Sequence, residues 1–117
     1  MSDANDIHGV ATTLVLVRDL LFSSRIVETA RAAGVSVRVV RDLTKLADAT
    51  GERMIVDLNQ AGFFDAAAAW KREKGGSVIA FVAHTDEQTI RRAKEAGFDR
   101  VLSNGAFTAQ LPALIAM

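Results

Sequence analysis

The sequence contains no cysteine, which excludes disulfide bridges and thiolate chemistry. It has no excess of charge of one sign, because 14 Lys and Arg residues balance 14 Asp and Glu residues. Direct nucleic-acid binding, which usually requires a basic excess, is therefore not expected. No apolar run approaches the roughly 18 residues typical of a transmembrane helix. The polar start over residues 1–9 does not resemble a signal peptide, so we expect a cytoplasmic protein.

The apolar content of the chain is sufficient for one domain with its own core. Hydrophobic residues make up 50% of the 117 residues, and no linker or low-complexity stretch divides them. We expect a flexible tail over residues 1–9 and a single domain over residues 10–117.

Five short apolar runs predict β-strands, and the segments between them have the apolar spacing of helices. The predicted strands are residues 12–17, 35–40, 53–57, 77–83 and 99–103. The predicted helices are residues 20–34, 42–51, 63–76, 85–97 and 106–117. This alternation favours an α/β fold, with a doubly wound, five-stranded parallel sheet covered by helices on both faces.

Several details of the helices can also be predicted. Ser23 and Ser24 are assigned to the start of the first helix, because serine favours N-caps, rather than to a nucleophile. Thr85 is the expected N-cap of the fourth helix. Pro112 is expected near the first turn of the last helix, where proline is tolerated.

In a parallel sheet of this kind, ligands bind outside the carboxyl ends of the strands. The residues expected there are Arg18, Asp19, Asp42, Asp57, Val82, Ala83, His84, Ser103 and Asn104. Any function of the crevice must use this set.

Asp57 is the most informative residue of this set, because it ends the apolar run "MIVD". An ionised carboxylate is costly to bury alone, so Asp57 either lies at a solvated strand end or has a cationic partner. If the first and third strands are neighbours, Asp19 and Asp57 could together bind Mg²⁺. A carboxylate beside Mg²⁺ can accept a phosphoryl group.

Other candidate residues favour structural roles. His84 is expected in a solvent-facing loop, because no second His or Cys lies near it in the sequence. No G-x-G-x-x-G follows the first strand, so a dinucleotide site is not expected. Phe63, Phe64 and Trp70 have the spacing of core contacts of the third helix. The basic run of Arg91, Arg92 and Lys94 suits a solvated helix face, with a partner-binding surface as the alternative.

Segments from three parts of the chain carry a family resemblance. They read "LVLVRDLLFSSRI", "IVDLNQAG" and "EAGFDRVLSNGAF". They resemble the first strand, the phospho-acceptor strand and the last strand of receiver domains in bacterial two-component response regulators. The resemblance runs from about Thr12 to Ile115 and implies a flavodoxin-like (βα)5 fold and a role in signal transduction.

The resemblance also implies roles for individual residues. Asp57 falls on the phospho-acceptor and Asp19 on the second acid of the metal-binding pair. Arg18 replaces the first acid, Val82 the hydroxyl residue and Asn104 the lysine. Because three of these five positions depart from the family pattern, we expect a degenerate pseudo-receiver without normal Asp phosphorylation and with weak or absent Mg²⁺ binding.

Arg18 offers a cationic partner for Asp57, because a guanidinium can bind a carboxylate bidentately. The sequence therefore predicts an Arg18–Asp57 ion pair in place of a metal. The protein is expected to be no enzyme. It is expected to bind a protein partner through the fourth helix, fifth strand and fifth helix, which form the usual output surface of the family. A homodimer is a further option. Two alternatives stay open, namely a phosphorylatable receiver and a small-ligand or enzymatic flavodoxin-like domain that uses the same crevice.

Overall fold

The computed structural model describes residues 12–117, and the predicted tail over residues 1–9 lies outside them. Five strands form one parallel sheet with the order β2-β1-β3-β4-β5. The strands are β1 (Thr12–Leu16), β2 (Ser36–Val39), β3 (Arg53–Asp57), β4 (Ser77–Val82) and β5 (Arg100–Ser103). Each lies within one residue at either end of the run predicted for it, which confirms the predicted fold class.

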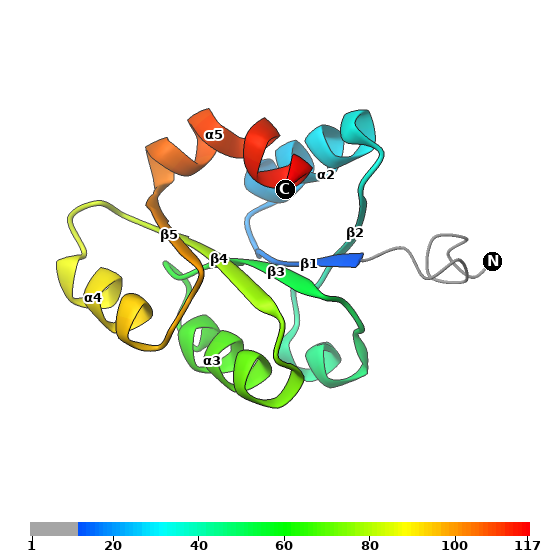
Figure 1. The fold of residues 1–117 in the computed structure, drawn as a ribbon. Helices are drawn as coiled ribbons and strands as arrows, with labels where there is room; N and C mark the ends of the chain where they lie inside the picture. The colour runs from blue at the N-terminus through cyan, green and yellow to red at the C-terminus, as the bar shows by residue number, and fades with distance from the viewer. Residues whose placement is uncertain (1–11) are drawn as a thin grey trace.

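The helices lie on both faces of this sheet, with α2 and α5 on one face and α3 and α4 on the other (Figure 1). The helical elements are α2 (Leu20–Ala33), the 3-10 helix η1 (Leu43–Asp48), α3 (Phe63–Lys74), α4 (Glu87–Glu95) and α5 (Asn104–Ala116). In the part of the chain that the structure describes, no helix is long and apolar enough to cross a membrane.

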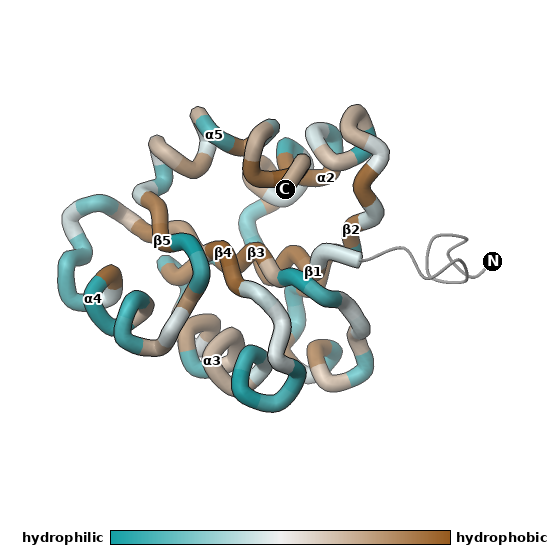
Figure 2. The backbone as a smooth tube through the Cα atoms, in the orientation of Figure 1, coloured by the Kyte–Doolittle hydropathy of each residue, from teal (hydrophilic) through white to brown (hydrophobic). Residues whose placement is uncertain are grey.

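The sheet separates two hydrophobic cores, because successive side chains of a strand point to opposite faces. Val15 and Ile55 contribute to the core under α2 and α5, which we call the α2/α5-side core. Leu14 and Val56 contribute to the core over α3 and α4, the α3/α4-side core. Figure 2 shows the strands as mainly hydrophobic and α4 as mainly hydrophilic. The continuous apolar runs of the sequence are thus explained by burial on both faces.

Three predicted details of the helices need correction. Ser23 and Ser24 lie near the start of α2, as predicted, but neither is its N-cap. The N-cap is Asp19, whose carboxylate accepts a hydrogen bond from the Phe22 N–H at 2.9 Å. Asp86 rather than Thr85 is the N-cap of α4. In both cases a carboxylate near the strand end reaches the free N–H groups of the first turn.

Pro112 is the third exception, because it lies well inside α5 rather than near its first turn. The helix begins at Asn104, directly after β5, and Ser103 caps it by accepting a hydrogen bond from the Ala106 N–H. The earlier start places Pro112 in the second half of the helix, on its exposed side.

The amino ends of the strands are held together by charged side chains. Arg53, at the start of β3, donates hydrogen bonds to the Thr13 hydroxyl and to the carbonyls of Leu114 and Ile115 in the last turn of α5. The Leu114 carbonyl also accepts a hydrogen bond from the Met117 N–H, and a cation at this end of the helix suits the helix dipole. Burial lowers the pKa of Arg53, which nevertheless stays charged.

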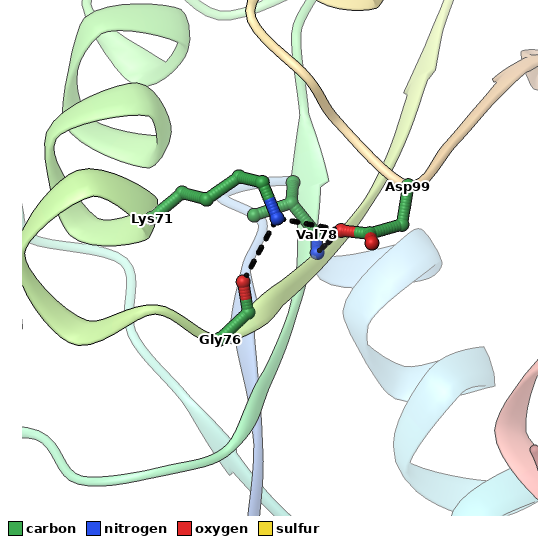
Figure 3. A network of polar contacts seen from close by, with 4 residues as sticks. All are labelled: Lys71, Gly76, Val78 and Asp99. Atoms are coloured by element: carbon green, nitrogen blue, oxygen red, sulfur yellow. Dashed lines mark hydrogen bonds and ion pairs between the residues drawn. The ribbon is translucent and has the colours of Figure 1, made fainter.

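A second charged contact ties the end of α3 to the start of β4 and to the turn before β5 (Figure 3). The Lys71 ammonium lies 2.9 Å from a carboxylate oxygen of Asp99 and also donates to the Gly76 carbonyl. The same Asp99 oxygen accepts a hydrogen bond from the Val78 N–H at 2.8 Å. These contacts hold the amino ends of β4 and β5 together, at the end of the sheet opposite to the predicted crevice.

Candidate functional site

The predicted crevice lies at the point where the order of successive strands in the sheet changes direction. From β1 the chain moves to β2 on one side and then back to β3 on the other. The carboxyl ends of β1, β3, β4 and β5 therefore surround a common site, as parallel α/β sheets require. Asp57 and Asn104 are both at this site, as predicted from the sequence.

Asp57 is a buried carboxylate at the end of β3, with only 3% of its surface exposed. One of its oxygens, Oδ1, accepts a hydrogen bond from the Asn59 backbone N–H at 2.9 Å and another from the Asn59 side-chain amide at 2.7 Å. The carboxylate is thus satisfied by neutral donors from the turn that follows its own strand. A solvated strand end, one of the two readings of "MIVD", does not describe it.

Asn59 joins three strand ends through its side chain. Its Nδ2 donates to Asp57 Oδ1 at the end of β3 and, at 3.1 Å, to Asn104 Oδ1 at the start of α5. Its Oδ1 accepts a hydrogen bond from the Ala83 N–H, directly after β4, at 2.9 Å. We call these contacts among Asp57, Asn59, Ala83 and Asn104 the Asn59 bridge.

The predicted ion pair between Arg18 and Asp57 is wrong. Among residues 12–117, the one ion pair within 4 Å is that of Lys71 with Asp99. The Arg18 guanidinium lies over the Phe63 ring instead, 5.6 Å from its centroid, in a cation–π arrangement.

The pleat of β1 explains this outcome. Leu16 is paired with Val56, so the residue level with Asp57 is Val17, directly after β1, which belongs to the α2/α5-side core. Arg18 is one residue further along and points to the other face, where Phe63 lies. Adjacent strand ends therefore do not bring these two charges together.

Val82 does not line the crevice either, which corrects its predicted place. It is fully buried in the α3/α4-side core, whereas Asp57 is paired with Phe81, a member of the α2/α5-side core. Because paired residues of neighbouring strands point to the same face, the next residue on the Asp57 side beyond Phe81 is Ala83, directly after β4. Alanine, like valine, has no hydroxyl group.

The two predicted metal ligands, Asp19 and Asp57, both accept hydrogen bonds within the protein. The Asp19 carboxylate caps α2, and Oδ1 of Asp57 is engaged by Asn59. Within the described range, no group of three or more Asp, Glu, His or Cys side chains is placed to hold a metal ion. Oδ1 of Asp57 would have to leave Asn59 before it could bind a metal ion, and weak or absent Mg²⁺ binding stays a prediction.

Asp42 follows β2 and forms a separate polar contact beside the crevice. The Thr44 backbone N–H lowers the pKa of the Asp42 carboxyl, and the Thr44 hydroxyl, Lys45 and Arg18 act in the same direction. Asp42 is the N-cap of η1, so its role at this strand end is structural.

The remaining candidates largely follow the predictions. His84 is exposed after β4, and Phe63 and Trp70 are buried in the α3/α4-side core. Phe64 is half-buried, and the Arg92 guanidinium lies 4.3 Å from its ring centroid. Arg92 is thus part of a cation–π contact as well as of an exposed helix.

Sequence reasoning missed Asn59, whose side chain forms hydrogen bonds with Asp57, Ala83 and Asn104 at the crevice. A signal was present, because an asparagine two residues after an aspartate in a turn commonly donates its backbone N–H to that carboxylate. The bonds from the Asn59 side chain to Ala83 and Asn104 could not be inferred, because they join residues 24 and 45 positions apart.

No protein-family model matches the sequence, and no curated protein matches it either. Solved structures do resemble the fold. The BeF3-activated receiver domain of DrrB, a Thermotoga maritima protein, superposes with a TM-score of 0.76 at 14% identity, covering 91% of this chain and 94% of that one. An orphan response regulator of H. pylori gives 0.75 at 14% identity, with 92% of each chain covered. A receiver protein from Burkholderia phymatum gives 0.69 at 19% identity, covering 92% and 96%. The chain therefore has the flavodoxin-like fold of response regulator receiver domains.

Proposed function

We propose that this protein is a receiver-like signalling module that acts by protein–protein contact, without normal phosphorylation of Asp57. The observation that carries the proposal is the state of the Asp57 carboxylate, which is buried and bonded to the neutral groups of Asn59. The fold and the position of Asp57 at the end of β3 support the receiver-like part of the proposal.

The surroundings of Asp57 are poorly suited to phosphoryl transfer. A transferring phosphoryl group carries negative charge, and enzymes stabilise it with cations and well-placed donors. Here the nearest candidates fail, since Arg18 lies over Phe63, Asn104 is neutral and Ala83 has no hydroxyl. We therefore assign the module no enzymatic activity of its own.

The contact surface that we propose consists of α4, β5 and α5. β5 is an edge strand of the sheet, and its Arg100 is exposed, with a 3.3 Å hydrogen bond to Gln110 of α5. Arg91 and Lys94 are exposed on α4 next to it. A cytoplasmic protein partner with acidic groups would suit this surface, and a second copy of the chain is an alternative occupant.

The test is phospho-transfer from acetyl phosphate with Mg²⁺, followed by intact-mass measurement. We expect no stable adduct on the wild-type protein, and a receiver domain that accepts phosphate under the same conditions serves as the positive control. An adduct that disappears in Asp57→Asn would contradict the proposal and favour a phosphorylatable receiver.

A further inference from the structure

We infer that the Asn59 side chain is a built-in tether, which holds the segment after β4 and the start of α5 against Asp57 in one arrangement. The inference rests on the proposed function, because a fixed strand-end geometry is useful to a module that acts by contact rather than by phosphorylation. The same atoms would otherwise be free to reorganise around a ligand.

The orientation of the Asn59 amide is dictated by its partners. The Asp57 carboxylate can only accept hydrogen bonds, so Nδ2 must face it. The Ala83 N–H can only donate, so Oδ1 must face it. The two requirements agree, and the second hydrogen of Nδ2 is then directed to Asn104 Oδ1.

The tether acts on segments that adjoin the proposed contact surface. Ala83 is the first residue after β4, and the chain continues from it through Asp86 into α4. Asn104 is the first residue of α5. One side chain thus restrains the points from which α4 and α5 depart, although these helices lie on opposite faces of the sheet (Figure 1).

Asn59 is exposed, whereas Asp57 is buried beneath it. The tether is therefore accessible to solvent and can open without unfolding of either core. Local opening of this kind is measurable as amide exchange that is faster than global unfolding.

The experiment is amide hydrogen exchange followed by NMR on the full chain. In the wild type, the Ala83 amide should exchange about tenfold or more slowly than that of His84, which has no hydrogen-bond partner among the described residues. Asn59→Ala should abolish this difference, while the exchange of Ile79, inside β4, reports on any change in global stability.

Two further variants serve as matched controls. Gln60→Ala removes a neighbouring amide side chain with no hydrogen bond in the structure described, and Ala83 should exchange as in the wild type. Asn104→Ala removes one arm of the bridge and leaves the bonds to Asp57 and Ala83, so it should change the Ala83 rate by less than about threefold.

Equal exchange of Ala83 and His84 in the wild type, or no change of Ala83 in Asn59→Ala, would overturn the tether. Neither outcome would affect the proposed function. Conversely, acetyl phosphate labelling of the wild type at Asp57 would overturn the proposed function and leave the exchange result valid, so the two failures are distinguishable.

Discussion

The two ends of the parallel sheet are built with different chemistry. At the amino ends of the strands, Arg53 is bonded to α5 carbonyls and to Thr13, and Lys71 is paired with Asp99. At the carboxyl ends, the buried Asp57 has no cation within 4 Å among residues 12–117, and Asn59 alone connects the strand ends through its side chain.

The difference separates stability from function. A cation bonded to carbonyls of the last helical turn is favoured by the helix dipole, so the amino end is arranged for stability. A buried carboxylate bonded only to neutral groups retains part of its desolvation cost, so the carboxyl end is not arranged for stability. Residues that violate local rules in this way are the ones expected at functional sites.

The largest expected effect is at the amino end. Arg53→Ala should lower the free energy of unfolding by about 2–3 kcal/mol, because it leaves the Thr13 hydroxyl and two carbonyls without their charged donor. Urea denaturation measures this loss.

The control for Arg53 is Arg72→Ala, which removes an exposed arginine on α3 and should change stability by no more than about 0.5 kcal/mol. Arg53→Lys should lie between the two, since lysine keeps the charge but not the planar fork of donors. A loss at Arg53 no greater than that at Arg72 would show that the amino end is not specially stabilised.

The second effect has the opposite sign and lies at the carboxyl end. Asp57→Asn should raise the free energy of unfolding at pH 7 by about 1 kcal/mol, because it removes a buried charge and keeps an oxygen that can accept from Asn59. The exposed change Asp48→Asn is the matched control. A substantial loss of stability in Asp57→Asn would mean that the carboxylate is stabilising, and the contrast between the two ends would disappear.

The smallest effect concerns acid sensitivity at the amino end. Burial raises the pKa of the Asp99 carboxyl, but the Val78 N–H and Lys71 lower it by more, so the pKa lies below its ordinary value of 3.8. A lowered pKa stabilises the folded state above the unfolded pKa, and this contribution is lost as the pH falls through the folded pKa.

Asp99→Asn should therefore cost about 0.5 kcal/mol at pH 7, because water screens a side chain that is 46% exposed. The difference between variant and wild type should shrink when urea denaturation is repeated near pH 3. A difference that stays constant between the two pH values would assign the contribution of Asp99 to packing rather than charge.

The sequence alone determined the layout of the molecule. The inner strands β1, β3 and β4 coincide with largely apolar runs, and burial on both faces of a parallel sheet is what makes such runs continuous. The positions of Asp57 and Asn104 at strand ends follow from the same local pattern, because a strand ends where its apolar run ends. These features depend on residues close together in the chain and are therefore readable from it.

The choice of side chains that meet at those strand ends depends on the three-dimensional arrangement of the sheet. A shift of one residue along a pleated strand moves a side chain to the other face, and this places Arg18 over Phe63 and Val82 in the α3/α4-side core. Two partners of Asn59, Ala83 and Asn104, come from strand ends that are distant in sequence, so their meeting depends on strand order and register. Asp57 is therefore bonded to a neutral amide instead of the predicted guanidinium, because register, rather than nearness in sequence, selects the partner of a buried charge.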